Sequence, residues 1–269
     1  MKILSLIPLV LLPFILYTNQ VKRDKRFICI QVESLDPYVN IDEMEADFLK
    51  WWTYHCNTIS LSSNFIAFNE NLDTIDKGQF LTKLSSGEFI PLRLKSNTQV
   101  ENYGLYKLGS LSDNSIGITI RNEALTKLRF FGMEGKSFPD FDFIDLNGNS
   151  YSKESTKGKI LVIKVWFINC KACVAEFPEL NAFVQKHENS KDIIFVSLAR
   201  DSKPALNQFL HKKYFKYQVV SEQIDFIVND LGLNIYPTHI VVDETGIVLK
   251  VCNRAAEMIA FLEDEINRK

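Results

Sequence analysis

The chain has 269 residues, of which 46% are hydrophobic and 24% are charged. At about 150 residues per domain this length allows one or two domains, and the balanced composition argues against a disordered, collagen-like or multi-span membrane protein. A formal net charge of −2 supplies no basic field for a phosphate backbone, which argues against nucleic acid as a partner. Five cysteines are too few for a disulfide scaffold of this length.

The first element is an apolar segment, residues 3–17, which only one serine and two prolines interrupt. As a helix it would measure about 22 Å, short of the roughly 30 Å hydrocarbon core of a bilayer. That length favours the hydrophobic part of a signal peptide, although four basic residues follow and no typical cleavage site precedes them. We expect export, with residues 1–20 as a signal peptide or an N-terminal membrane anchor. The alternative is a buried N-terminal helix.

Residues 27–132 are interpreted as a smaller, β-rich N-terminal α+β domain of unknown role. Alternating segments such as 88–94 and 115–120, separated by turn residues, predict strands. Residues 43–57 differ, because helix formers and aromatic side chains predict one helix whose aromatic face packs in a core rather than on a protein partner. The adjacent His55 and Cys56 have no second pair at ligand spacing, so no metal site is expected there.

Residues 133–269 show a different order of expected strands and helices. Alternation at 140–145 and a turn at 147–149 predict a hairpin, and the apolar run 159–168 predicts a strand buried on both faces. The remaining expected elements are a helix over 170–187, a strand over 193–197, helices over 204–213 and 221–231, strands over 238–243 and 246–252, and a helix over 257–267. Such alternation predicts βαβ units with antiparallel strands added by the last hairpin.

Cys170 and Cys173 carry the chemistry, because the buried strand 159–168 runs directly into the helix that holds them. At a helix N-terminus, unpaired backbone N–H groups and the helix dipole stabilise a thiolate. We therefore expect Cys170 to attack a disulfide and Cys173 to resolve the mixed disulfide.

A zinc site is the main alternative for the cysteine pair, and it would need a second pair of ligands at zinc spacing. The remaining candidates do not form such a pair: Cys252, His187 and His211. Cys29, Cys56 and Cys252 are instead expected to be small buried hydrophobic residues.

Further motifs stand in register with the cysteine pair. In chain order they are Phe138-Pro139-Asp140-Phe141, Trp166, Glu176-Phe177-Pro178-Glu179-Leu180, Tyr236-Pro237-Thr238 and Asp243-Glu244-Thr245-Gly246. With them, residues 133–269 resemble the exported TlpA/ResA-like thiol-disulfide oxidoreductases of the thioredoxin-like superfamily, which carry a domain of the AhpC/TSA-Redoxin type. The resemblance covers the C-terminal half only and implies an α/β, thioredoxin-like fold with a central mixed sheet flanked by helices.

The resemblance also implies roles for single residues. The family proline that matches Pro237 is cis and packs against the disulfide, so Pro237 and Tyr236 are expected to bind an extended substrate segment. Trp166, four residues before Cys170, is expected to bind substrate as well. Pro178 matches a proline that kinks the family's helix, which its missing N–H explains.

Three features depart from the family pattern. Asn169 replaces the usual Trp before the first cysteine, and Lys171 and Ala172 replace a dipeptide that ends in Pro. Lys171 should favour the thiolate of Cys170, and a more stable reduced form makes the couple more oxidising. Lys164 stands where thioredoxins carry a buried acid.

Glu176 is the acid of the family's C-x-x-C-x-x-E motif. A buried Lys164 needs a partner, and Glu176 is the candidate; the alternative is a solvated Glu176 and a Lys164 that reaches the sheet edge. Glu176 is expected to take the proton of Cys173, with a pKa that is coupled to that of Lys164. For His239 a hydrogen-bonded core position is expected rather than a place in the site.

These features predict a thiol-disulfide oxidoreductase that exchanges disulfides with exported proteins, preferentially as a reductase. It is expected to be periplasmic, or anchored to the membrane by residues 3–17 and facing the periplasm. No cofactor is expected beyond the Cys170–Cys173 disulfide, and the expected partners are protein thiols or disulfides and an upstream electron donor or acceptor. The alternative is a non-catalytic thioredoxin-like module whose N-terminal domain recognises a protein, which the intact cysteine pair disfavours. Phe167 replaces the Thr of peroxiredoxins, so peroxidase activity is not expected.

Overall fold

The computed structural model of the chain describes residues 40–95 and 100–268. The predicted signal segment and Cys29 lie outside these residues. Within the described ranges no helix is long and apolar enough to cross a membrane.

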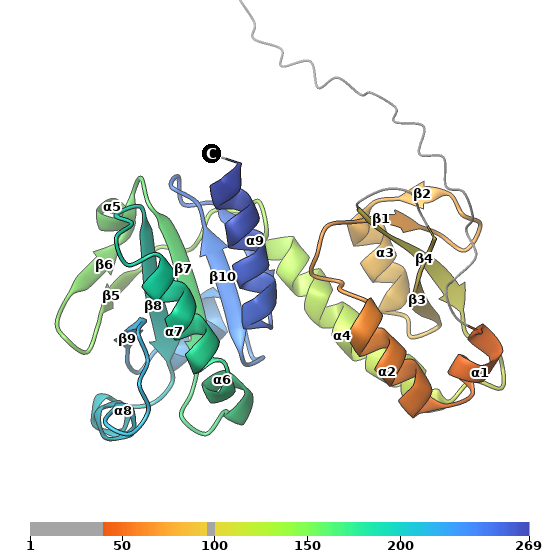
Figure 1. Ribbon diagram of the computed structural model, residues 1–269, viewed down its shortest axis with the longest axis horizontal. Helices are drawn as coiled ribbons and strands as arrows, with labels where there is room; N and C mark the ends of the chain where they lie inside the picture. Colours follow the sequence, from red (N-terminus) through yellow and green to blue (C-terminus); the bar gives the residue numbers. More distant parts are fainter. Residues whose placement is uncertain (1–39, 96–99, 269) are drawn as a thin grey trace, which may run out of the picture. The chain divides into compact units, whose positions relative to one another are not determined.

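A four-stranded sheet with strand order β2-β1-β4-β3 organises the N-terminal part, as Figure 1 shows. Its strands are β1 (Phe65–Phe68), β2 (Thr74–Ile75), β3 (Phe89–Arg93) and β4 (Glu101–Lys107), and its helices are α1 (Ile41–Glu45), α2 (Phe48–Thr58), α3 (Lys77–Leu84) and α4 (Asn114–Met133). β1 and β4 are parallel, and the other two pairings are antiparallel. The predicted strand at 88–94 is confirmed as β3.

The strand predicted at 115–120 is wrong, because these residues begin helix α4. The carboxylate of Asp113 caps this helix by accepting from the N–H of Ser115 at 2.8 Å. Ile116 and Ile120 are four residues apart and fully buried, whereas Ile118 between them is 63% exposed. The three isoleucines alternate with Gly117 and Thr119 as in a strand, but two of them also fit one helix face, and that face packs into the core.

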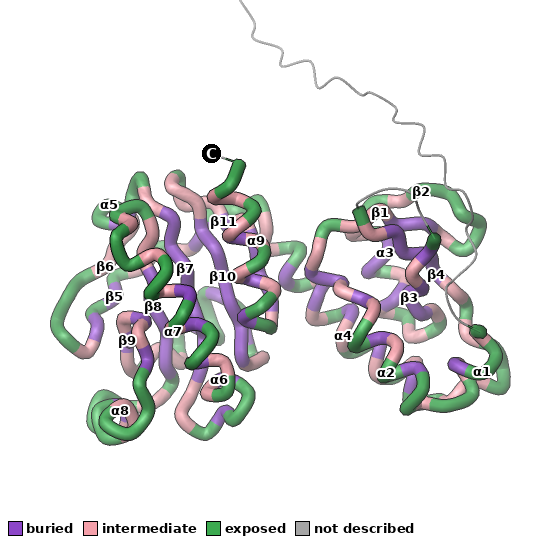
Figure 2. Tube along the Cα trace, in the orientation of Figure 1, coloured by how far each residue is buried: buried purple, intermediate pink, exposed green. Residues whose placement is uncertain are grey.

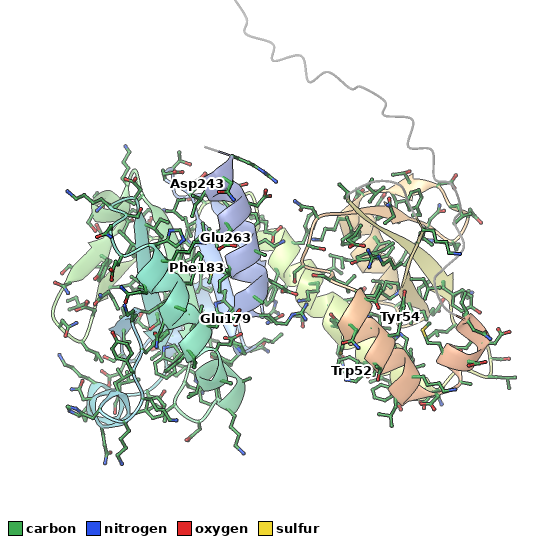
Figure 3. The ribbon with its side chains drawn as sticks, viewed as in Figure 1. Trp52, Tyr54, Glu179, Phe183, Asp243 and Glu263 are labelled. Atoms are coloured by element: carbon green, nitrogen blue, oxygen red, sulfur yellow. A yellow bond between two sulfur atoms is a disulfide. The ribbon has the colours of Figure 1, made fainter. Side chains whose placement is uncertain are left out.

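The single helix predicted at 43–57 is two helices, α1 and α2, with a break before Asp47. The Asp47 side chain accepts from two backbone N–H groups of α2 and so begins a new helix there. Trp51 is fully buried, as the core interpretation requires, while Trp52 is 39% exposed; Figure 3 shows Trp52 and Tyr54 on this helix.

His55 and Cys56 lie in different environments in the structure. His55 is buried and binds Glu123 with 2.7 Å between Nε2 and Oε2. Cys56 is exposed, which corrects the expectation that it is a buried hydrophobic residue. Among the described residues no group of three or more histidine, cysteine or acidic side chains lies together.

The C-terminal part contains a five-stranded sheet with order β11-β10-β7-β8-β9 and a separate hairpin, β5-β6. The strands are β5 (Asp142–Ile144), β6 (Ser150–Ser152), β7 (Ile160–Trp166), β8 (Ile193–Ala199), β9 (Gln218–Val220), β10 (Thr238–Val242) and β11 (Val248–Cys252). The helices are α5 (Lys153–Thr156), α6 (Lys171–Ala175), α7 (Phe177–Lys186), α8 (Lys203–Leu210), α9 (Ala255–Asn267) and the π-helix η1 (Phe226–Asp230). β7, β8 and β9 run parallel, and β10 pairs antiparallel with β7 and β11. This is the expected mixed sheet flanked by helices.

Two details differ from the sequence prediction in this part. The short strand β9 was not predicted, and the helix predicted over 221–231 is confined to its second half. Glu222, with a φ of 60°, lies just after β9 and delays the helix. The helix predicted over 170–187 divides at Glu176. This position shortly precedes Pro178, the proline that was expected to kink the helix.

Successive side chains of β7 pack on opposite faces of the sheet. Ile160, Val162 and Trp166 pack on the face that α6, α7, α8 and α9 cover. Leu161, Ile163 and Val165 pack on the other face, in a cluster that includes Phe130 from α4 and Ile227 from η1. Figure 2 shows the central strands buried along most of their length. The segment that carries the cysteines therefore follows a strand that is covered on both faces.

Candidate active site

Cys170 and Cys173 form a disulfide just beyond the end of β7. The S–S distance is 2.01 Å and the Cα atoms are 5.2 Å apart. Cys170 is the N-cap residue of α6, and its sulfur accepts from the N–H of Cys173 at 3.2 Å. Cys170 is 8% exposed and Cys173 is not exposed at all. Of the two cysteines, Cys170 is therefore the one that keeps some exposed surface.

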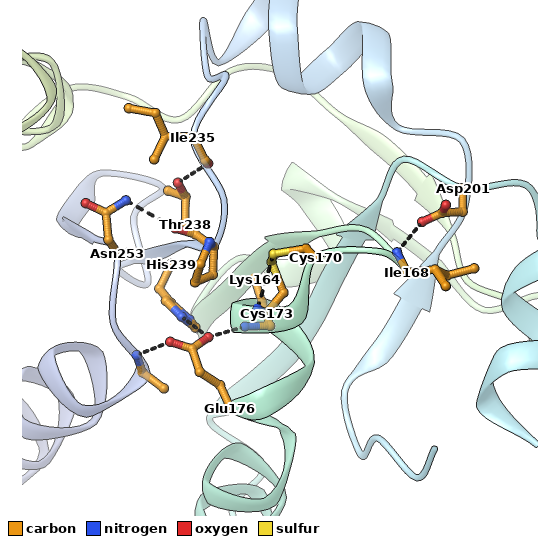
Figure 4. Close-up of a disulfide and its surroundings, with 12 residues drawn as sticks. Lys164, Ile168, Cys170, Cys173, Glu176, Asp201, Ile235, Thr238, His239 and Asn253 are labelled. Atoms are coloured by element: carbon orange, nitrogen blue, oxygen red, sulfur yellow. Dashed lines mark hydrogen bonds and ion pairs between the residues drawn. A yellow bond between two sulfur atoms is a disulfide. The ribbon is translucent and has the colours of Figure 1, made fainter. Parts of the chain in front are cut away.

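The turn between β7 and α6 is fixed by the neighbouring parallel strand. Asp201, just after β8, accepts from the N–H of Ile168 through its carboxylate at 2.8 Å, as Figure 4 shows. The N–H of Cys170 also donates to the carbonyl of Phe167 at 3.1 Å. Asp201 was not predicted as a site residue. Asp201 follows a strand that was expected to be parallel to β7. Because ligand sites lie at the carboxyl ends of parallel strands, this position could have indicated a site residue.

A row of side chains crosses the sheet beneath the disulfide. His239 on β10 lies opposite Lys164 on β7 and Cys252 on β11, so the three residues share one face. Glu176, at the junction of α6 and α7, meets this row. Its Oε2 is 2.5 Å from Lys164 Nζ and 3.1 Å from His239 Nε2, and its Oε1 accepts from the N–H of Ala255 at 2.9 Å (Figure 4). The predicted pairing of Lys164 with Glu176 is confirmed.

The contacts of Glu176 set its protonation. Burial acts to raise its pKa, but the hydrogen bond and charge of His239 and the charge of Lys164 outweigh burial and lower the pKa to about 2. Burial lowers the pKa of Lys164, and the carboxylate of Glu176 opposes this effect. In the disulfide form Glu176 is therefore a carboxylate that already accepts three contacts, and Lys164 depends on it for compensation of a fully buried charge.

His239 is a fully buried, hydrogen-bonded histidine, as expected, but its partner is the acid of the site. Burial lowers its pKa, and the hydrogen bond to Glu176 opposes this. Because Glu176 is ionised and only accepts, the Nε2 atom of His239 must carry the hydrogen. Nδ1 is buried with no hydrogen-bond partner within the described chain. The predicted site residues Lys164 and Glu176 and the expected core residue His239 thus form one cluster.

The Tyr236–Pro237 peptide bond is cis, as the resemblance implied. Two hydrogen bonds hold this segment: the amide of Asn253 donates to the carbonyl of Pro237 at 3.1 Å, and the hydroxyl of Thr238 donates to that of Ile235 at 2.7 Å (Figure 4). Burial raises the pKa of the half-buried Tyr236. Asn253 was not predicted as a site residue, because only the pairing of β10 with β11 brings it beside Pro237.

Trp166 has no exposed surface for the substrate contact that was predicted for it. Its side chain is fully buried and packs edge to face against Phe177 at 5.1 Å and Phe215 at 5.8 Å between ring centroids. It is a core residue of the same buried cluster as the two cysteines. Asn169 and Lys171, by contrast, are exposed on either side of Cys170. Cys252 is buried, as expected, and burial raises the pKa of its thiol to about 12.

The C-terminal half of the chain, which contains the site, is similar to known proteins. The family model described as Redoxin matches residues 133–260. The C-terminal half of this chain is a TlpA/ResA-like thioredoxin-fold domain. Among curated proteins, it is similar to thiol-disulfide oxidoreductase ResA of Bacillus thuringiensis (strain Al Hakam), with 27% identity over 116 residues that cover 43% of this chain and 67% of the relative. It is also similar to the thioredoxin-like protein YneN of Bacillus subtilis (strain 168), with 25% identity over 117 residues, 43% of this chain and 68% of the relative.

Solved structures match the same half. The thioredoxin domain of a thiol-disulfide oxidoreductase from Bacteroides vulgatus aligns with a TM-score of 0.45 and 21% identity, over 49% of this chain and 96% of that one. A putative thiol:disulfide interchange protein DsbE from Chlorobium tepidum aligns with a TM-score of 0.44 and 22% identity, over 50% and 96%. The family match and the curated relatives make this chain a redox enzyme of the thiol-disulfide oxidoreductase class.

Proposed function

We propose that the chain reduces disulfides of exported proteins through the Cys170–Cys173 couple. The observation that carries this proposal is the unequal placement of the two sulfurs. Cys170 caps a helix, where a thiolate is stabilised, and keeps 8% of its surface exposed, whereas Cys173 has no exposure. An accessible attacking thiol backed by a buried resolving thiol is the arrangement that disulfide exchange needs.

In the proposed reaction the Cys170 thiolate attacks one sulfur of a substrate disulfide. A bond between Cys170 and the substrate forms, and the other substrate sulfur leaves as a thiolate. The thiol of Cys173 then loses its proton and attacks Cys170, which closes the Cys170–Cys173 bond and releases the second substrate thiolate. Two electrons pass to the substrate, and an upstream dithiol must return them before the next cycle.

Trapping of the mixed disulfide tests the assignment of roles. Cys173→Ser removes the resolving thiol, so substrate proteins should stay bound to Cys170 and separate only after reduction. Cys170→Ser is the matched control and should trap nothing, because Cys173 is not exposed. Trapping by Cys170→Ser, or by neither variant, would contradict the proposal.

The reducing direction is tested by the reduction potential of the couple. A value near about −270 mV is that of a reductant such as thioredoxin, and a value near about −120 mV is that of a strong oxidant. We expect the more negative value. Lys171 acts in the opposite direction if it stabilises the thiolate, so Lys171→Gln should shift the potential further down.

Glu176 is proposed to accept the proton of Cys173 during resolution. A pKa lowered to about 2 makes it a weak base in the disulfide form. Its contribution would show as a slower exchange rate and an altered pH profile in Glu176→Gln. Glu179→Gln, an exposed residue on the same helix, is the control and should match the unmodified protein. Identical profiles for all three proteins would assign the proton to water instead.

The proposed export rests on the apolar segment 3–17. Expression of the full chain with fractionation should place it outside the cytoplasm, and sequencing of its N-terminus should distinguish a cleaved signal from a retained anchor. A soluble cytoplasmic protein with an intact N-terminus would contradict export.

A further inference from the structure

Arg200 lies at the end of β8, beside the turn that leads to Cys170. Its backbone N–H donates to the carbonyl of Trp166 at 3.3 Å. The next residue, Asp201, binds the N–H of Ile168 in the same turn. The side chain of Arg200 is exposed, so a cation lies on the surface next to the segment that presents the attacking cysteine. The proposed reaction assigns no role to this cation.

Two aromatic rings hold the guanidinium of Arg200. Its Cζ is 5.2 Å from the ring centroid of Phe167 and 5.4 Å from that of Tyr236. These two rings pack edge to face with 5.2 Å between their centroids. A guanidinium over aromatic rings keeps its planar fork of N–H groups ordered for a carboxylate. Phe167 precedes the cysteine pair in the chain, and Tyr236 directly precedes Pro237. The guanidinium of Arg200 therefore contacts both of the segments that flank the proposed substrate site.

No acidic residue of the chain uses this cation, as far as the chain is described. Within residues 40–95 and 100–268 no carboxylate forms an ion pair with Arg200 or with the exposed Lys171. The adjacent carboxylate of Asp201 is bound to the backbone N–H of Ile168. Glu222 donates its backbone N–H to the carbonyl of Asp201, and its side chain is exposed. The ordered guanidinium therefore has no acidic partner in this part of the protein.

We infer that Arg200 is a specificity-determining residue that binds a carboxylate side chain of the substrate polypeptide, near the cysteine that Cys170 attacks. This inference rests on the proposed function. The carboxylate forms a pair at the exposed edge of the guanidinium, with Phe167 and Tyr236 fixing the plane of the fork. An exposed ion pair of this kind raises kcat/KM by up to about fivefold, because it is worth at most about 1 kcal/mol.

Three peptides that differ only beside their cysteine test the inference. Each carries one cysteine as a mixed disulfide with methanethiol, flanked by two Glu, two Gln or two Lys residues. The full-length protein is reduced, freed of reductant and mixed with each peptide, and its oxidation is followed by quenched alkylation and mass spectrometry. The proteins compared are the unmodified chain, Arg200→Gln, and Lys203→Gln as a control that removes an exposed charge three residues away.

We expect the unmodified protein to prefer the Glu peptide over the Gln peptide by about threefold to fivefold at low ionic strength. Arg200→Gln should bring this ratio to one, and Lys203→Gln should leave it unchanged. A ratio of one in the unmodified protein, or an equal loss in both variants, would overturn the role of Arg200 while the exchange activity stands. No reaction with any peptide would overturn the proposed function and the inference together.

Discussion

Replacement of Glu176 by Gln removes the charge that compensates Lys164 and keeps the size of the side chain. Lys164 is fully buried, and the Glu176 side chain beside it is 16% exposed. Removal of one partner from a buried ion pair costs about 3–5 kcal/mol of folding free energy. The amide oxygen of Gln can still accept from His239 and from the N–H of Ala255. We therefore expect a loss of about 2–3 kcal/mol at pH 7, below the full value.

This loss should depend on pH with a definite sign. The pKa of Glu176 falls from an ordinary 4.5 to about 2 in the folded protein. A carboxyl with a lowered folded pKa stabilises the fold fully above its unfolded pKa, and the stabilisation disappears as the pH falls toward the folded pKa. The difference in unfolding free energy between the unmodified protein and Glu176→Gln should thus be constant above about pH 5.5 and shrink between about pH 4.5 and pH 2.

Urea unfolding of the disulfide form, followed by circular dichroism at pH 7, 4 and 2.5, measures these differences. Glu179→Gln is the control, because Glu179 is exposed on the same helix; it should change stability by less than about 0.5 kcal/mol. Lys164→Met combined with Glu176→Gln removes both charges and should recover most of the loss. A difference that stays the same at all three pH values, or a double variant as unstable as Glu176→Gln, would refute the reasoning.

Three further predictions concern single contacts. Alkylation of the native disulfide form at pH 8 should modify the exposed Cys56 and leave Cys252 untouched, because burial raises the pKa of Cys252 to about 12; mass mapping that finds Cys252 modified would contradict this. Asp201→Ala should cost about 1–2 kcal/mol in urea unfolding by leaving the N–H of Ile168 unpaired, while Asp201→Asn retains an acceptor and should cost less. Gly117→Ala should cost about 1–3 kcal/mol, since a Cβ there would lie 2.6 Å from the carbonyl oxygen of Gly87. On the same helix Gly132 has nothing within 4 Å of such a Cβ, so Gly132→Ala should stabilise the chain by about 0.5–1 kcal/mol; similar effects at both positions would show that the close approach does not matter.

Those parts of the site that depend on local spacing were predictable from the sequence. The cysteine pair follows a long apolar strand, and the physical need of a buried Lys164 for a counter-charge selects Glu176. The hairpin β5-β6 and the fully buried β7 were predictable for the same reason, since turn residues and apolar runs mark them directly.

Other parts depend on tertiary contacts that spacing does not encode. Asp201 acts on the turn before Cys170 only because β8 runs parallel beside β7. Trp166 has the expected place in the motif, but the direction of its side chain follows from the pleat of β7, which turns it into the core. The segment 115–120 satisfies both the strand and the helix pattern, and only the cap at Asp113 and the packing of Ile116 and Ile120 decide between them.

Helix α4 is shared by two hydrophobic cores. Its first turns bury Ile120 and Ala124 with the N-terminal sheet, and Phe130 near its end belongs to the cluster on the far face of the C-terminal sheet. A boundary drawn at residue 133 would therefore cut an aromatic side chain out of the redox half. We therefore expect an excised catalytic fragment that begins at Asp113, the cap of this helix, to be more stable than one that begins at residue 133, because it keeps Phe130 in this cluster.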